Sequence, residues 1–303
     1  MLFVAHGFTK DRELSSWRKV SLLTWGRPSD PSAYGILELD ATNALAYVER
    51  ARESGGAHVT LTHLIGKAIA LAISERPEVN AIVRRGGGLH RRESVDVFFQ
   101  VAFDGGQDLS GAKVARADEK SVAEIALELA SRTERIRAHA DRSLQRTQAL
   151  LDRLPGPLRG AALRLAELAT YDLGLDLRSL GVPYDQFGSV MVTNVASFGL
   201  PMAFAPLVPF SRVPLLLTVG RVTDGPMVVG GALVVRPVLR IGVTLDHRVL
   251  DGFGAGRLAR RFLAVMADPI AALGAPAERP ARAPRPNGPR SNGPRSNGPG
   301  RQR

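Results

Sequence analysis

The chain has 303 residues, 45% of them hydrophobic, which is enough to bury one large core or two modest ones. Cysteine is absent, and this excludes a disulfide framework, a thiolate metal site and an acyl-cysteine intermediate. Of the formal net charge of +11, about +6 lies in residues 278–303, so the rest of the chain is only mildly basic and a nucleic-acid partner is not expected.

No targeting or membrane segment is evident in the sequence. Residues 1–8 have no basic region ahead of an apolar stretch, which a secretory signal would have. The most apolar segment, residues 202–220, contains three prolines and Arg212, and it falls short of the roughly 20 apolar residues that a membrane span needs. We therefore expect a soluble cytoplasmic protein without a transmembrane segment.

Strand and helix signals alternate from residue 34 onward. Residues 34–39 predict a short strand, and Asp40 or Thr42 is expected to cap a helix that runs to about Ser54. Residues 60–75 predict a second helix, because apolar side chains recur on one face at helical spacing. These side chains are Leu61, Leu64, Ile65, Ala68, Ile69, Ala72 and Ile73.

The next elements are a hairpin, a strand and a helix. Residues 80–84 and 89–91 flank a triple glycine and predict the two strands of a hairpin. Residues 95–103 are rich in β-branched and aromatic side chains, which is typical of a strand. The Ser-x-x-Glu capping box at residues 121–124 predicts a helix that runs to about residue 140.

Residues 144–177 predict an amphipathic helical pair inserted in the domain. Its apolar stripe consists of Leu158, Ala162, Leu165 and Ala169. We expect an extra helical hairpin packed on the core, and the alternative is a lid or a surface for a lipid-like acyl chain or a partner. Length alone decides nothing, because long insertions cost little free energy.

The C-terminal half completes the expected fold. Four strands are predicted at residues 189–194, 214–222, 227–235 and 238–245, followed by a helix at residues 252–266. Strands and helices mixed without strict alternation predict an α/β two-layer sandwich with a mixed sheet, spanning residues 1–273. Residues 274–303 are rich in Pro, Gly and Arg, so we expect a disordered basic tail, with contact to RNA, anionic lipid or an acidic partner as the alternative.

His247 is the candidate catalytic residue. It follows an apolar strand and precedes Asp251, Gly252 and a helix, so a rigid scaffold would hold it where a ligand can reach it. A neutral imidazole can accept a proton, Asp251 would brace the turn, and Gly252 would let another backbone approach closely. The alternative is a histidine that merely ends a strand. The histidines show no spacing typical of metal ligands, so no metal is expected.

The segment around His247 resembles a family motif. Asp246-His247-Arg248-Val249-Leu250-Asp251-Gly252 is similar to the D-H-R-V-x-D-G motif of the 2-oxo acid dehydrogenase acyltransferases (the dihydrolipoyl acyltransferase component). Their catalytic domain belongs to the chloramphenicol acetyltransferase-like superfamily, which has the same two-layer fold. Further segments resemble the family in the family's order, over roughly residues 15–267: 17–19, 61–81, 117–125, 190–199 and 219–222.

The resemblance implies roles for individual residues. In this family the motif histidine removes a proton from the thiol of coenzyme A or dihydrolipoamide, and here that role falls to His247. The thiolate attacks an acyl thioester, and the hydroxyl at the position of Thr193 donates to the oxyanion, an interaction worth about 3–4 kcal/mol. Asp251 holds the catalytic loop, with Arg18 as its ionic partner. The residues expected to bind substrate are Asn194, Ser197 and Gly252.

The resemblance also implies an assembly and a substrate. Family members form homotrimers, or higher assemblies of trimers, in which Thr193 of one subunit meets His247 of another. Coenzyme A is the expected substrate, and no covalently bound cofactor is expected. No lipoyl domain is recognisable, so lipoamide would come from a lipoyl-carrying protein in trans. Residues 108–114 and 204–209 depart from the family's V-P-V and F-x-P-I-I-N patterns, which leaves the acyl group and the acceptor open.

Three functions follow from these observations. An active acyltransferase is favoured because the histidine, the hydroxyl and the aspartate-glycine pair are all retained. A non-catalytic trimeric scaffold or regulator is the alternative, supported by the changed segments and the basic tail. A peptide-condensation domain shares the H-x-x-x-D-G pattern, but the chain is short and lacks a doubled histidine.

Overall fold

The computed structural model describes residues 30–54, 57–84, 88–103, 108–137, 155–175, 177 and 184–276. Several predicted features lie outside these residues. They are Arg18, most of the glycine turn of the first hairpin, residues 144–154 of the inserted segment and nearly all of the basic tail.

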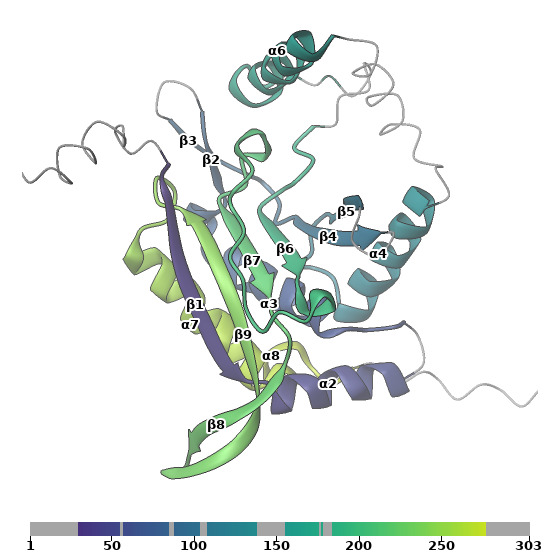
Figure 1. Ribbon diagram of the computed structural model, residues 1–303, viewed down its shortest axis with the longest axis vertical. Helices are drawn as coiled ribbons and strands as arrows, with labels where there is room; N and C mark the ends of the chain where they lie inside the picture. The colour runs from purple at the N-terminus through teal and green to yellow at the C-terminus, as the bar shows by residue number, and fades with distance from the viewer. Residues whose placement is uncertain are drawn as a thin grey trace, which may run out of the picture.

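The described residues form a mixed sheet of seven strands (Figure 1). The strand order is β1-β9-β7-β6-β4-β5, and β8 pairs with the far part of β9. β4, β6 and β7 run parallel to one another, whereas every other pairing is antiparallel. The strands are β1 (Ser32–Asp40), β4 (Val97–Phe103), β5 (Asp108–Val114), β6 (Val190–Asn194), β7 (Leu215–Val219), β8 (Thr223–Val229) and β9 (Ala232–Asp246).

Helices pack on the sheet to form the main core. α3 (Leu61–Ser74) lies at the centre and contacts two strands and the neighbouring helices. Its predicted apolar stripe is confirmed, since every member is buried except the partly buried Leu61. Around it lie α2 (Thr42–Glu53), α4 (Val122–Arg137), α7 (Gly252–Ala267) and α8 (Pro269–Leu273). The predicted two-layer arrangement of a mixed sheet with helices is thus confirmed.

The loop between β6 and β7 covers part of the other face of the sheet, and two glycines make this possible. A Cβ atom on Gly220 would lie 1.9 Å from the carbonyl oxygen of Pro201, and one on Gly242 would lie 2.0 Å from that of Ala203. The Thr244 hydroxyl donates to the carbonyl oxygen of Ala205 at 2.8 Å and fixes the loop there. Neither glycine can be replaced without moving the loop.

The structure corrects the prediction of one strand at residues 227–235. This region is a hairpin in which β8 and β9 join through Gly230 and Gly231, whose φ angles are +58° and +83°. Two adjacent positive φ angles make the tight turn that suits paired strands, and Gly-Gly is one of its sequence signals. β9 then continues for 15 residues through Pro237, where two separate strands were expected.

Strand β5 was missed by the sequence analysis. It pairs with β4 at the edge of the sheet, and Gly111 lies directly under the ring of Phe98, where a Cβ atom would come within 2.4 Å of the ring. Pairing with β4, rather than local β-propensity, therefore places this segment in the sheet.

The helix starts agree only partly with the predicted caps. Ala41, not Asp40 or Thr42, occupies the N-cap of α2, although the Asp40 carboxylate accepts from the Thr42 amide at 2.8 Å. The capping box of α4 is confirmed, because Ser121 and Glu124 exchange hydrogen bonds at 2.7 and 3.2 Å.

The described part of the inserted segment contains α6 (Gly156–Glu167) and a π-helical turn at Leu168–Asp172. Leu158 and Leu165 of the predicted apolar stripe are exposed, so this stripe does not pack on the core within the described chain. Ion pairs anchor the segment instead: Arg212 contacts the carboxylates of Glu167 at 2.7 Å and Asp172 at 3.2 Å. None of the described helices is long and apolar enough to cross a lipid bilayer.

A histidine cap makes the start of α3 sensitive to pH. The Nδ1 atom of His63 accepts from the Thr60 amide at 3.1 Å, and burial, followed by the nearby His58, lowers the pKa of His63 to about 4. The unfolded chain binds this proton near pH 6.5, so the unfolded state takes up more protons between pH 6.5 and 4. The stability contributed by neutral His63 is complete above pH 6.5 and falls as the pH drops through this window.

We predict that His63→Gln flattens this part of the stability profile. Glutamine keeps an acceptor for the Thr60 amide but does not titrate, whereas wild type should lose on the order of 1–3 kcal/mol between pH 6.5 and 4 beyond the loss in the variant. Urea unfolding across this range measures both profiles. Parallel profiles for the two proteins would contradict the assignment.

Candidate active site

The loop that carries His247 is fixed by backbone hydrogen bonds at the end of β9. The Asp246 amide donates to Pro214 and the His247 amide donates to Pro31, both at 2.9 Å. The amides of Val249 and Leu250 donate back to the Asp246 carbonyl at 3.0 Å. β9 and the starts of β1 and β7 thus determine where the histidine lies.

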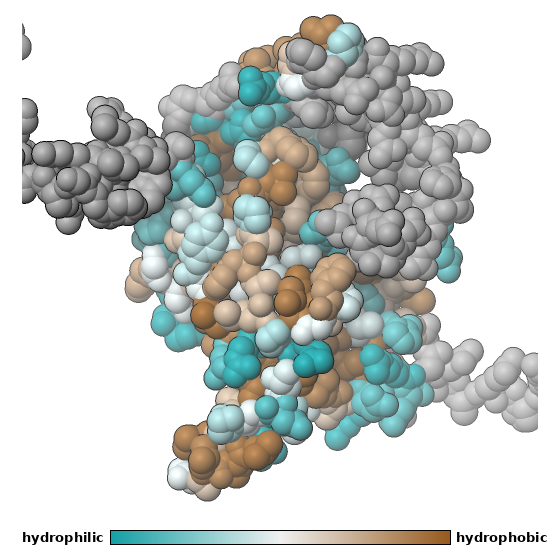
Figure 2. Space-filling model, in the orientation of Figure 1, coloured by the Kyte–Doolittle hydropathy of each residue, from teal (hydrophilic) through white to brown (hydrophobic). Residues whose placement is uncertain are grey.

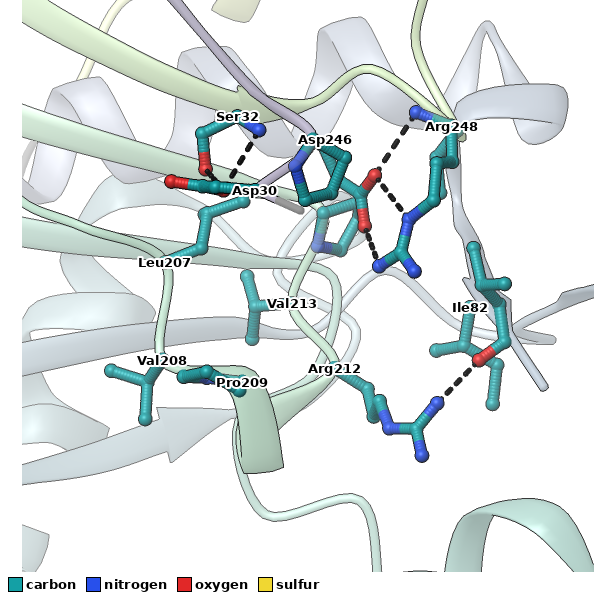
Figure 3. A pocket seen from close by; sticks show the side chains of 14 residues that line it. Asp30, Ser32, Ile82, Leu207, Val208, Pro209, Arg212, Val213, Asp246 and Arg248 are labelled. Atoms are coloured by element: carbon teal, nitrogen blue, oxygen red, sulfur yellow. Dashed lines mark hydrogen bonds and ion pairs between the residues drawn. The ribbon is translucent and has the colours of Figure 1, made fainter. Parts of the chain in front are cut away.

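A side-chain ion pair braces the same loop (Figure 3). The Arg248 guanidinium donates to both carboxylate oxygens of Asp246, at 2.9 and 2.6 Å, and the Arg248 amide adds a third bond at 3.0 Å. The hydrogen bond that Arg248 donates to Asp246 raises the pKa of Arg248. Asp246 is 8% exposed, so the pair is anchored in the protein at one end. Both residues belong to the motif around His247, but no role was predicted for either of them.

Asp251 is the N-cap of α7. Its carboxylate accepts from the Gly254 amide at 2.7 Å, in agreement with the expectation that it holds the loop. Gly252 does not have the predicted close backbone contact, since no atom of the described chain lies within 4 Å of a Cβ atom placed there. Within this chain, a side chain would therefore fit at position 252.

A cavity of about 500 Å³ lies beside His247. The histidine is exposed, so a ligand in the cavity can reach its ring. Arg76, Arg91 and Arg257 also line the cavity, and none of them has an ion pair with a carboxylate in the described part of the chain. Two acidic residues, Glu78 and Asp251, also line the cavity, but arginines outnumber them. The cavity is therefore basic and suits a substrate with negative charge.

Thr193 does not lie beside His247 in this chain. Strand pairing aligns Thr193 with Thr218 of β7, and Thr218 with Gly242 of β9. His247 is five residues further along β9, so the two side chains are separated by about 16 Å along the strand direction alone. The expected general base and the expected oxyanion donor therefore belong to opposite ends of the sheet.

The remaining predicted site residues lie near Thr193. The Asn194 amide donates to the Thr62 hydroxyl at 2.8 Å, and its oxygen accepts from the Ala196 amide at 2.9 Å. Both polar ends of this side chain are thus engaged within the chain. Ser197 is exposed, and its hydroxyl lies 3.5 Å from the Asn194 carbonyl oxygen. Contact of Asn194 and Ser197 with substrate stays a prediction.

A smaller cavity of about 110 Å³ lies behind the loop that carries His247 (Figure 3). The Asp246–Arg248 pair forms one wall, and Val208 and Arg212 form another. Residues 204–209, which depart from the family pattern, therefore reach the back of the loop that presents His247. Among the described residues, no group of three or more His, Asp or Glu side chains could hold a metal ion.

Comparison with known proteins gives consistent matches. Residues 10–148 and 184–274 match the family described as "2-oxoacid dehydrogenases acyltransferase (catalytic domain)". The lipoamide acyltransferase component of the branched-chain alpha-keto acid dehydrogenase complex of Bacillus subtilis is 24% identical over 236 residues, which are 76% of this chain and 45% of that protein. The chain thus spans about half the length of this curated relative.

Two solved structures share the fold. The dihydrolipoamide acetyltransferase of Azotobacter vinelandii, studied for the catalytic role of a serine, a histidine and an asparagine, has a TM-score of 0.58 and 21% identity over 80% of this chain and 84% of that one. A chain from the cubic core of the pyruvate dehydrogenase multienzyme complex has a TM-score of 0.57 and 20% identity over 88% of this chain and 94% of that one.

We predict that Asp251→Ala lowers the free energy of unfolding by about 1 kcal/mol, because α7 loses its cap, whereas Asp251→Asn keeps most of it. Asp268→Ala is the matched control, since Asp268 caps α8 by accepting from the Ala271 amide at 3.0 Å. Urea unfolding should show similar losses for both alanine variants. The NMR signals of the His247 ring should shift in the Asp251 variant and not in the control; unchanged signals in both would contradict a bracing role for Asp251.

Proposed function

The chain belongs to the 2-oxoacid dehydrogenases acyltransferase (catalytic domain) family, and from this premise we propose that it moves an acyl group between coenzyme A and a thiol acceptor such as dihydrolipoamide. The observation that carries the proposal is the placement of His247, exposed beside a basic cavity on a loop that hydrogen bonds and an ion pair make rigid. Preorganisation of this kind is what a general base requires.

The catalytic residues studied in the Azotobacter enzyme support the same roles here. Its histidine and asparagine are four residues apart, as His247 and Asp251 are, and its serine precedes the histidine by about fifty residues, as Thr193 does. Asp251 caps α7 in this chain, so we assign it the task of holding the loop rather than moving a proton.

The proposed reaction has two steps. The ring of His247 removes the thiol proton as the sulfur attacks the thioester carbonyl carbon, and the carbonyl electrons move to the oxygen. The tetrahedral intermediate then collapses, the original carbon–sulfur bond breaks, and the departing thiolate takes the proton from the imidazolium. A hydrogen bond donated by the Thr193 hydroxyl stabilises the oxyanion between these steps.

The active site in this proposal lies between subunits of a homotrimer. Thr193 and His247 are too far apart to act together within one chain, so Thr193 must come from a neighbour. A relative forms a cubic core, and a cubic assembly contains threefold axes. The β8–β9 hairpin also projects from the body of the sheet (Figure 1), with an apolar face that includes Leu233 and Val235, which are 76% and 75% exposed.

Charge and shape favour coenzyme A as one substrate. Three of the arginines that line the His247 cavity, Arg76, Arg91 and Arg257, have no carboxylate partner among the described residues and can attract a phosphate-bearing thiol. The lipoyl group, as the second thiol, is proposed to reach the site on another protein. Within the changed segment 204–209, Leu207, Val208 and Pro209 line the smaller cavity behind the loop, and the segment is proposed to influence which acyl group is accepted.

The first test is acyl transfer from acyl-coenzyme A to dihydrolipoamide. We expect acceptor-dependent release of coenzyme A that His247→Ala reduces by more than about a hundredfold, because general-base catalysis contributes that much or more. Acyl-coenzyme A of several chain lengths and a reaction without acceptor are the controls. Turnover that does not depend on His247 would exclude the proposed mechanism, and no turnover with any thioester would favour a scaffold.

A second prediction concerns the division of the site between chains. Thr193→Val should lower kcat by about a hundredfold or more through loss of the oxyanion donor. Co-expression of His247→Ala and Thr193→Val chains in equal amounts should restore roughly a quarter of the activity, since about one interface in four combines both intact groups. A mixture no more active than its two components would place both groups in the same chain.

A third prediction concerns the hairpin. Leu233→Asp places a charge on the exposed apolar face of the β8–β9 hairpin and should convert trimers to folded monomers, as measured by light scattering and circular dichroism. Leu165→Asp introduces the same charge at an exposed leucine of α6 and serves as the control, with no change in oligomeric state. Trimers that persist in the Leu233 variant would exclude the hairpin from the interface.

A further inference from the structure

A second cavity, of about 450 Å³, lies beside the β2–β3 hairpin and is distinct from the cavity of His247. β2 (Ala81–Val83) and β3 (Leu89–Arg91) pair antiparallel as a separate small sheet. The second cavity also involves the inserted segment, because Thr170 and Tyr171 of the π-helical turn line it. Its volume falls within the range of small-molecule sites.

The register of the hairpin assigns its two faces to different cavities. Ile82 lies opposite His90, so these residues share one face with Arg84 and Arg92, and all four line the second cavity. Ala81 and Leu89 belong to the other face and line the cavity of His247. The hairpin is therefore a thin wall between the two cavities.

Most charges in the second cavity are paired. Arg92 donates to both oxygens of Asp185 at 2.8 and 3.0 Å, and Lys113 contacts the Asp96 carboxylate at 2.9 Å. Burial acts to raise the pKa of Asp96, but hydrogen bonds from Lys113 and the Arg116 amide lower it overall, so this carboxylate stays charged and keeps its partner.

Arg84 is the exception on this face. Its Nε atom is buried without a hydrogen-bond partner, and its side chain forms no ion pair within the part of the chain that the structure describes. The guanidinium extends toward the inserted segment, where an atom at the Cβ position of Gly174 would lie 3.6 Å from Nη2. A buried donor without a partner destabilises the folded chain, and more so when it carries a charge. An anion bound at the guanidinium would partly offset this cost by pairing with its charge.

The inserted segment makes the wall opposite the hairpin rigid. The Tyr171 hydroxyl donates to the Ser211 carbonyl oxygen at 3.2 Å, and Arg212 ties the same turn to the Val83 carbonyl oxygen at 2.6 Å. Burial raises the pKa of Tyr171, so the ring remains a neutral phenol. Hairpin and insertion thus enclose Arg84 from two sides.

We propose that this second cavity binds a phosphate group, carried by a small molecule or free in solution, with the forked donors of Arg84 as its principal contact and Arg91 at its rim. Arginine suits this task because its planar donors match the oxygens of phosphate. Arg91 lines both cavities, so an anion bound here lies next to the wall of the His247 cavity. The proposal concerns binding and does not rest on acyl transfer.

The test is isothermal titration of the full chain with inorganic phosphate, coenzyme A and dephospho-coenzyme A at constant ionic strength. Arg84→Gln should weaken phosphate-dependent binding by about tenfold or more. Arg84→Lys keeps the charge but loses the forked donors, so its affinity should lie between those of wild type and Arg84→Gln. Arg221→Gln is the matched control, because Arg221 is an exposed arginine outside the cavity. Circular dichroism verifies that each variant folds.

The outcomes separate the sources of the phosphate. Binding of inorganic phosphate that depends on Arg84 supports a site for the free anion. Arg84-dependent preference for coenzyme A over its dephospho form, without binding of inorganic phosphate, supports a nucleotide phosphate as the ligand. The proposal is overturned if no probe binds, or if Arg84→Gln and Arg221→Gln change the affinities equally. Loss of acyl transfer in His247→Ala bears only on the catalytic proposal.

Discussion

The pairing of β9 is the constraint on which the rest of the molecule depends. This strand bonds to β1 and β7 along its second half and to β8 along its first half. Because side chains alternate across a sheet, a slip of one residue would exchange the buried and exposed faces of the whole strand. The same pairings end at Asp246, so the register that builds the core also sets the position of His247.

Arginine is used in two ways around the catalytic loop. Arg248, Arg92 and Arg212 form forked or multiple contacts with carboxylates and carbonyl oxygens, and these contacts hold loops together. The other arginines of the two large cavities have no carboxylate partner among the described residues, and they are the ones to which we assign ligands. Arginines that are paired with carboxylates stabilise the fold, whereas unpaired arginines beside a cavity can bind a negatively charged ligand.

Contacts of Arg212 connect the inserted segment to the loop that carries His247. Arg212 joins the turn after α6 to β2, and it also lines the small cavity behind Asp246 and Arg248 (Figure 3). Hydrophobic side chains gather on the visible face near the middle of the molecule and on the projecting β8–β9 hairpin (Figure 2), which fits surfaces that meet other molecules. A substitution in the insertion can therefore influence the active site through packing, without touching a substrate.

Local signals in the sequence were sufficient for most helices, the capping box at Ser121 and the histidine motif, because each depends on residues within a few positions of one another. Tertiary structure alone decided that β5 joins the sheet and that Thr193 lies at the opposite end of the sheet from His247. The Gly230–Gly231 pair is typical of a tight hairpin turn and could have predicted this turn from the sequence. What remained hidden depends on strand register and on contacts between distant segments, and neither is encoded in any short stretch of chain.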